Sequence, residues 1–368
     1  CAMPPTPTAT ERPMALANAR PLLSVRNLRV SFALDEGLVR AVDGTSFDVM
    51  PGQVLGVVGE SGCGKSVTMR AILQLVERPG RITAGEIHFR RRPVNGGGED
   101  SAEVVDIARL PPRGPVMRDI RGGEIALIPQ EPMAAFSPVH TVGDQIVEAI
   151  LLHGHRWQEG GRKLTRREAR DITVGLFRDV GISMPEQRID AFSWQLSGGL
   201  RQRAMIAMAL SCKPRLLIAD EPTTAIDVTT QAQVLALLRD LQARYGTAII
   251  FITHDLGVIA QMASYVVVMY LGRVMEEGPV DDIFHAPKHP YTRALLRSIP
   301  SLYGETRVAL PVISGALPHP FNRPPGCPFH PRCPDVMTKC AGAVPSLQPV
   351  GTSQLASCFL HHDVVDPA

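Results

Sequence analysis

The run at residues 59–66, GESGCGKS, constrains the fold of this chain more than any other feature. It fits G-x-x-x-x-G-K-[ST], the phosphate-binding loop of proteins that bind nucleoside triphosphates. Apolar residues 54–58 precede the loop as an expected buried strand, and residues 67–73 follow it as an expected helix. Such a loop wraps backbone N–H groups around a phosphate chain at the positive end of a helix dipole. A glycine-rich turn that binds nothing is the alternative, and the strand and helix in register argue against it.

The loop supplies most of the candidate ATP contacts. Lys65 can neutralise the β- and γ-phosphates, and the Ser66 hydroxyl can ligate Mg²⁺. Cys63 lies at a helix N-terminus, where the pKa of a thiol tends to fall. We expect alkylation of Cys63 to block nucleotide binding through the bulk of the added group. The predicted ATP-binding residues of the loop are Gly59, Ser61, Gly62, Cys63, Gly64, Lys65 and Ser66.

Two adjacent carboxylates supply the second half of the predicted site. Asp220 and Glu221 end the hydrophobic run at residues 215–219, which reads as a strand. The end of such a strand places Asp220 near the Mg²⁺ shell, and it places Glu221 where a general base can polarise the attacking water. An isolated Asp-Glu pair more often begins a solvated loop, but the phosphate-binding loop upstream favours the functional interpretation.

Gln130 and His254 follow two further predicted strands, at residues 125–128 and 248–253. Open α/β sheets bind ligands at the ends of their strands, so Gln130 is predicted to reach Mg²⁺ and water, and His254 the γ-phosphate. Isolated Gln and His residues are usually structural, and their place at strand ends favours a functional role here. The predicted catalytic residues are Glu221, His254 and Gln130, and the predicted Mg²⁺ ligands are Ser66, Gln130 and Asp220.

With these motifs and the run LSGGLRQ at residues 196–202, the chain resembles the ATP-binding subunit of ATP-binding-cassette (ABC) transporters over residues 22–300. The resemblance implies an α/β P-loop fold with a parallel-sheet core, an antiparallel β element and a helical subdomain. It also implies two cassettes packed head to tail, with each ATP held between them. The residues that would contact the partner's ATP in trans are Ser197, Gly198, Gly199 and Asp227. Phe32 either stacks on adenine or is a buried core residue.

Residues 270–279 and 289–296 resemble the peptide and nickel importer branch, which includes the dipeptide and oligopeptide permease ATPases. The proline- and cysteine-bearing run at residues 325–334 is the most specific mark of this branch. Leu200 and Ile226 depart from its usual residues. Both departures are apolar, so they bear on the identity of the solute and leave ATP hydrolysis untouched.

The resemblance implies an ATP-hydrolysing subunit that energises import of di- or oligopeptides or similar small solutes. Import of nickel or another solute by the same branch is one alternative, and a soluble ABC ATPase outside transport is another. The implied partners are a second, distinct ABC ATPase subunit, two transmembrane permease subunits and a solute-binding protein. The implied location is peripheral, at the cytoplasmic face of the cell (inner) membrane.

Charge and hydropathy agree with these partners. The formal net charge of +2 argues against a nucleic-acid partner. No run of about 18 apolar residues is present, so separate subunits are expected to form the pore. A repair-type ATPase would carry a long coiled coil, and a translation-type ATPase a second cassette; the sequence shows neither feature.

Four cysteines, Cys327, Cys333, Cys340 and Cys358, lie in a proline-rich tail with too few apolar residues for a core of its own. Small segments of this kind are often held by a metal. Four thiolates suit zinc or an iron–sulfur cluster, and free or disulfide-bonded cysteines are the third alternative. A mixed Cys/His zinc site that includes His330, His361 or His362 is a further alternative on this pattern. The resemblance to peptide importers implies a 4Fe–4S cluster on these four residues. The predicted cofactors are therefore ATP, Mg²⁺ and a 4Fe–4S cluster, with zinc as the alternative metal.

The expected layout has three parts: a disordered tail at residues 1–21, the cassette at residues 22–300, and a small Cys-rich C-terminal domain at residues 301–368. The helical subdomain is expected at about residues 138–196. Residues 91–123 carry three consecutive glycines and a proline pair, so they are expected to be irregular.

Overall fold

A computed structural model describes residues 20–91, 102–131, 135–154, 163–224, 227–299, 313–319 and 321–366. All but the last two residues of the predicted N-terminal tail lie outside these ranges, so its disorder stays a prediction.

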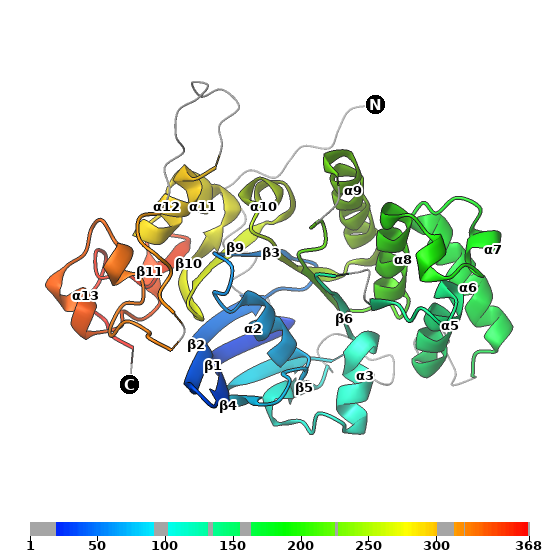
Figure 1. Cartoon of the computed structure of the whole chain (residues 1–368), viewed down its shortest axis with the longest axis horizontal. Coiled ribbons are helices and arrows are strands. Elements are labelled where there is room, and N and C mark those ends of the chain that lie inside the picture. Colours follow the sequence, from blue (N-terminus) through cyan, green and yellow to red (C-terminus); the bar gives the residue numbers. More distant parts are fainter. Residues whose placement is uncertain are drawn as a thin grey trace.

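An eight-stranded sheet runs through the centre of the molecule, in the order β11-β12-β10-β9-β3-β8-β7-β6 (Figure 1). The pairs formed among β9, β3, β8, β7 and β6 are parallel, and β10, β12 and β11 join on in antiparallel fashion. The strands are β3 (Val54–Val58), β6 (Ile125–Ile128), β7 (Leu216–Asp220), β8 (Ala248–Ile252), β9 (Tyr265–Tyr270), β10 (Arg273–Pro279), β11 (Gln348–Val350) and β12 (Gln354–Ala356). Every residue of β3, β7 and β8 is buried, which explains why these strands are continuous apolar runs.

The parallel strands are buried because both faces of the sheet are covered. On β3, Leu55 and Val57 pack into one apolar cluster, whereas Val54 and Val58 pack into another. Successive side chains of a strand point to opposite faces, so this division follows from the strand itself. The first cluster contains the helix α2 (Lys65–Ile72) and the antiparallel sheet, and the second contains the helices α8 (Gly198–Leu210), α9 (Val228–Tyr245) and α10 (Leu256–Met262).

The second sheet is antiparallel, in the order β2-β1-β4-β5, and it confirms the predicted antiparallel element. Its strands are β1 (Leu23–Leu34), β2 (Gly37–Val49), β4 (Gly80–Arg90) and β5 (Val104–Asp106). The expectation of an irregular segment at residues 91–123 is wrong for its described part, which forms β5, the 3₁₀ helix η2 (Ile107–Arg109) and the helix α3 (Pro115–Gly123). Ile107, Met117 and Ile120 are fully buried, and this burial outweighs the nearby glycine and proline residues.

A group of helices lies at one end of the molecule, shown in green in Figure 1. It includes α5 (Val142–Leu152), α6 (Arg166–Asp179), α7 (Pro185–Arg188) and the 3₁₀ helix η4 (Ser193–Gln195). Thr165 is the N-cap residue of α6, where it forms a capping box with Glu168. These helices fall inside the predicted helical subdomain, whose exact limits stay a prediction.

The C-terminal residues lie at the opposite end and pack directly on the cassette (Figure 1). They form η5 (His330–Arg332), α13 (Thr338–Gly342), β11 and β12, after α11 (Val280–His285) and α12 (Pro290–Arg297). The strand β12 pairs with β10, which places β11 and β12 in the same sheet as the phosphate-binding strand. The structure therefore does not show the separate Cys-rich C-terminal domain that the sequence predicts.

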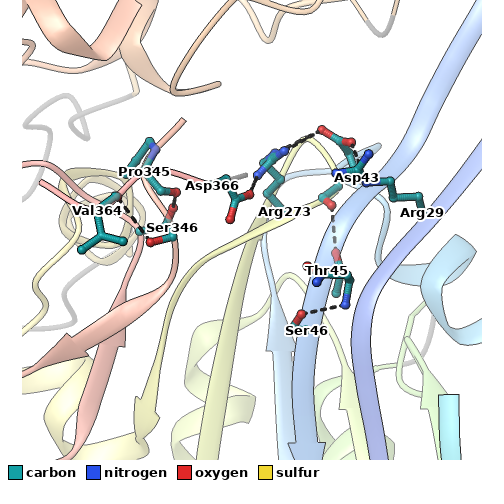
Figure 2. Close-up of polar contacts among 12 residues, drawn as sticks. Arg29, Asp43, Thr45, Ser46, Arg273, Pro345, Ser346, Val364 and Asp366 are labelled. Carbon is teal, nitrogen blue, oxygen red and sulfur yellow. Dashed lines mark hydrogen bonds and ion pairs between the residues drawn. The ribbon is translucent and has the colours of Figure 1, made fainter. Parts of the chain in front are cut away.

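Arg273, at the start of β10, links the end of the chain to the antiparallel sheet (Figure 2). Its Nε and Nη2 lie 3.1 and 3.0 Å from Oδ2 of Asp43 on β2, and its Nη1 donates to Asp366. The side chains of Arg273 and Asp43 are only 12% and 10% exposed. Burial alone would raise the pKa of Asp43, but Arg273 and Arg323 hold it below its usual value.

We expect Arg273→Gln to lower the free energy of unfolding by about 3 kcal/mol, because it leaves the buried Asp43 carboxylate without its main partner. Since the pKa of Asp43 is lowered in the folded chain, this stabilisation is present above the ordinary Asp pKa and is lost as the pH falls. Urea unfolding at neutral and acidic pH measures both effects. Arg109→Gln is the control: Arg109 is 78% exposed, so its pairs should contribute little. Equal losses in the two variants would contradict the prediction.

Candidate functional site

The loop at residues 59–66 joins β3 to α2, as the sequence predicts. Gly59 and Gly64 have φ angles of 149° and 98°. A Cβ atom at Gly59 would lie 2.2 Å from the carbonyl oxygen of Met269, and one at Gly64 would lie 2.4 Å from that of Ala41. Only glycine fits these two positions, because both the backbone angle and the close approach exclude a side chain.

Lys65 begins α2 and is buried inside the loop. Its Nζ donates to the carbonyl oxygens of Gly59, at 2.8 Å, and Glu60, at 3.1 Å. The N-cap residue of α2 is Gly64, so no side-chain hydrogen bond caps the N-terminus of this helix. The ammonium group and the helix N-terminus therefore meet in one loop, an arrangement that suits a phosphate chain.

Asp220 ends β7 beside Ser66. The Ser66 hydroxyl lies 3.1 Å from Oδ1 of Asp220. Burial raises the pKa of Asp220, and the hydrogen bond from Ser66 opposes this rise. Two of the three residues predicted to ligate Mg²⁺, Ser66 and Asp220, thus lie side by side, although β7 is far from α2 in the sequence.

The Glu221 carboxylate contacts side chains from three segments. Gln130 Nε2, after β6, lies 3.1 Å from Oε2, and the Thr224 hydroxyl lies 3.0 Å from the same oxygen. His254 Nδ1, after β8, lies 3.3 Å from Oε1. Burial alone would raise the pKa of Glu221, but the hydrogen bonds from His254 and Thr224 lower it below its usual value.

The structure therefore brings the three predicted catalytic side chains into direct contact. Thr224 is an addition that the sequence reasoning missed as a site residue. Its place three residues after Glu221, in a Pro-Thr-Thr run, was the available signal.

Ser197 and Asp227 occupy equivalent places at two helix starts. Ser197 caps α8 through the backbone N–H of Leu200, and Asp227 caps α9 through Thr230. A Cβ added at Gly198 would meet no described atom within 4 Å. The start of α8 is therefore open, and the predicted contacts in trans depend on a second cassette.

Phe32 lies on β1, paired with Val39 and Gly80. Its ring carbon Cε1 would lie 2.4 Å from a Cβ at Gly80, and the ring packs against the buried cluster of the antiparallel sheet. This packing favours the core alternative, and adenine stacking stays a prediction.

Cys63 departs from its predicted chemistry. Burial raises its pKa, and the charge of Lys65, whose Nζ lies 3.7 Å from the sulfur, offsets this only in part. The thiol is fully buried. The expected fall in pKa is therefore wrong, because loss of hydration outweighs the helix N-terminus and the neighbouring ammonium group.

The four C-terminal cysteines line one small cavity of about 10 Å³, together with His289 and Phe329. All four have free thiols. Burial raises the pKa of Cys327 to about 12 and that of Cys358 to about 11, and the neighbouring cysteines add to both rises. Within the described ranges, no group of three or more His, Cys, Asp or Glu side chains is arranged to hold a metal ion. The predicted metal site is therefore not confirmed.

The phosphate-binding loop after β3 and the carboxylates at the end of β7 define a P-loop nucleoside triphosphatase. Residues 42–224 match the family "ABC transporter", and residues 275–340 match "Oligopeptide/dipeptide transporter, C-terminal region". The chain is 43% identical to a dipeptide transport ATP-binding protein of Escherichia coli, over 92% of this chain and 96% of that protein. It is 44% identical to an oligopeptide transport ATP-binding protein of Bacillus subtilis, over 93% and 97%. The chain belongs to the family of ABC transporter ATP-binding proteins.

Two solved structures share the fold. The dimeric cassette MJ0796, bound to ADP and Pi, has a TM-score of 0.57 at 22% identity and covers 70% of this chain and 98% of its own. The cbiO1 protein of Clostridium perfringens has a TM-score of 0.53 at 23% identity and covers 72% and 91%. The predicted cassette fold is confirmed, and so is the prediction of an ATPase coupled to transport.

None of the helices in the described ranges has both the length and the apolar character needed to cross a membrane.

We expect an alkylating reagent to label Cys63 slowly near neutral pH and faster as the pH rises past the ordinary thiol pKa. The reason is that the thiolate is the reactive form and burial raises the pKa of Cys63. MgATP should protect the thiol, because bound phosphates would cover the loop that carries it. Mass spectrometry of the peptide that carries Cys63 measures the rate, with Cys212 as the buried control outside the loop. Fast labelling at neutral pH, unchanged by MgATP, would show that the thiol is accessible.

Proposed function

We propose that this chain is the ATP-hydrolysing subunit that energises import of di- or oligopeptides. The supporting observation is the similarity to dipeptide and oligopeptide transport ATP-binding proteins, at 43–44% identity over more than nine-tenths of the chain. The C-terminal match at residues 275–340 supports the same solute class. These names favour peptides over nickel.

The geometry supports separate roles for the residues around the γ-phosphate. Lys65 would neutralise the phosphate chain, while Ser66, Gln130 and Asp220 would hold Mg²⁺. Glu221 accepts a proton from the attacking water. Its lowered pKa keeps the carboxylate ionised at neutral pH, as a base must be.

The side chains around Glu221 support this role. Gln130 and Thr224 both bond to Oε2, which fixes the plane of the carboxylate. His254 bonds to Oε1, and its side chain is 63% exposed. His254 can therefore turn toward a γ-phosphate without disturbing the packed core.

A second cassette would complete the site. Ser197, Gly198 and Gly199 would present the open N-terminus of α8 to the partner's ATP, and Asp227 would lie at the same interface. The remaining partners in this proposal are two membrane permeases and a solute-binding protein, with the ATPase at the cytoplasmic face of the membrane.

We also propose a metal centre on the four C-terminal cysteines, with a 4Fe–4S cluster as the first choice and zinc as the alternative. The support is that one cavity is lined by all four thiols. A single zinc ion needs sulfur atoms about 3.8 Å apart, given bonds of about 2.3 Å. Four cysteine thiolates are also the usual ligand set of a 4Fe–4S cluster. Bound there, a cluster would tie the tail together.

Glu221→Gln should preserve ATP binding and slow hydrolysis about 10²–10⁴-fold, because it removes the general base and keeps the shape of the side chain. The measurement is phosphate release by the complete transporter, with the partner cassette's own site disabled. Peptide uptake into vesicles should fall with hydrolysis. Glu36→Gln, in an exposed turn, is the control and should behave like the parent.

Two outcomes would contradict this account. Parental hydrolysis by the Glu221→Gln variant would show that another group activates water. Stimulation of the parent by a nickel-loaded binding protein, with none by a peptide-loaded one, would overturn the peptide assignment and leave the ATPase chemistry intact.

Protein purified without oxygen should be brown and contain about four irons per chain if the cluster is present. Cys340→Ser should lose most of the iron, whereas Cys212→Ser, which changes a buried cassette thiol, should keep it. Elemental analysis with the absorption spectrum measures this. One zinc and no iron would replace the cluster with zinc, and no metal at all would remove both.

A further inference from the structure

Glu60, the second residue of the phosphate-binding loop, is held by a side chain from the far end of the sequence. Nη1 of Arg332 lies 2.7 Å from Oε2 of Glu60, and Nη2 lies 3.1 Å from Oε1. This is a bidentate pair, the strongest common geometry for arginine and a carboxylate. The Arg332 side chain is 5% exposed and that of Glu60 is 27% exposed, so water screens the pair weakly.

The backbone of Glu60 is fixed by a second hydrogen bond. Its N–H donates to the hydroxyl of Tyr291, on α12, at 3.0 Å. Tyr291 packs against Tyr270 and Phe329, with ring centroids 4.7 and 5.2 Å away, and all three rings are buried. Arg332 also donates to the Tyr270 hydroxyl at 3.2 Å.

Arg332 and Phe329 both lie between Cys327 and Cys333. Arg332 is fixed on its other side by the carbonyl oxygens of Ser314 and Ile313, at 3.2 and 3.4 Å. The C-terminal segment therefore contacts the phosphate-binding loop in two ways. The Arg332 guanidinium bonds to Glu60, and Phe329 packs against Tyr291, which bonds to the Glu60 backbone.

The negative charge of Glu60 makes its position important for ATP binding. Lys65 Nζ donates to the backbone oxygen of the same residue, at 3.1 Å, so the Glu60 side chain branches off close to the phosphate-binding ammonium. A free carboxylate there would repel the phosphates of ATP and compete for Lys65. Paired with Arg332, the carboxylate is neutralised and turned toward the C-terminal segment.

We propose that Arg332 is a positioning residue of the nucleotide site: by pairing with Glu60 it keeps a negative charge away from the ATP phosphates, and the C-terminal segment thereby sets ATP affinity. The inference rests on ATP binding at residues 59–66. It is independent of the transported solute and of any metal on the cysteines.

Three variants of the full chain test the proposal, each titrated with MgATP. Arg332→Gln keeps a hydrogen-bonding side chain but leaves Glu60 charged, so the Kd for MgATP should rise about tenfold. Glu60→Gln together with Arg332→Gln should return the Kd to within about twofold of the parent, because no charge remains to repel ATP. Hydrolysis at saturating MgATP should change less than the Kd. The control is Arg170→Gln, which breaks an exposed bidentate pair with Asp190 far from the loop and should leave the Kd unchanged.

An unchanged Kd in Arg332→Gln would overturn the proposal. So would a double variant as weak as Arg332→Gln alone, since the pair would then act only through packing. If Arg332→Gln fails to fold, the Kd values of Glu60→Asp and Glu60→Gln for MgATP test the proposal instead. The shorter Asp keeps a charge that cannot reach Arg332 with both oxygens and should weaken MgATP binding, whereas Gln should not. Equal Kd values for these two would overturn the inference, and failure of the parent to bind MgATP would instead count against the site itself.

Discussion

The parallel pairing of β3, β8, β7 and β6 is the constraint on which the rest of the structure depends. Parallel strands end at the same edge of a sheet, so the residues that follow them must meet there. The phosphate-binding loop follows β3, the carboxylates follow β7, Gln130 follows β6 and His254 follows β8. A site assembled from four distant segments therefore needs no long loop to close it.

The antiparallel extension of the same sheet has a different effect. The strands β10, β12 and β11 carry the C-terminal segment on the sheet that also holds the phosphate-binding loop. Arg273 then ties β10 to Asp43 and to Asp366 (Figure 2), and Arg332 ties the cysteine run to Glu60. The tail is thus a structural part of the cassette, braced at two places by buried guanidinium groups.

Burial explains the places where sequence patterns misled. The N-terminus of a helix lowers a thiol's pKa in water, but Cys63 is fully buried, and loss of hydration reverses the shift. The turn-forming residues near position 111 predict irregular structure, but Met117 and Ile120 find an apolar cluster to enter. In the tail, the few apolar residues looked too sparse for a core, yet Phe329 packs into the core of the cassette instead.

The sequence by itself determined the phosphate-binding loop, the strands that end in functional residues, and the family, because each of these is written in short contiguous motifs. Only the tertiary structure decided which side chains touch. The bonds of Glu221 to Gln130 and His254 span 91 and 33 residues, and the pair between Glu60 and Arg332 spans 272. Contacts over such separations depend on strand order and packing. The local hydrophobic periodicity of the sequence specifies neither of these.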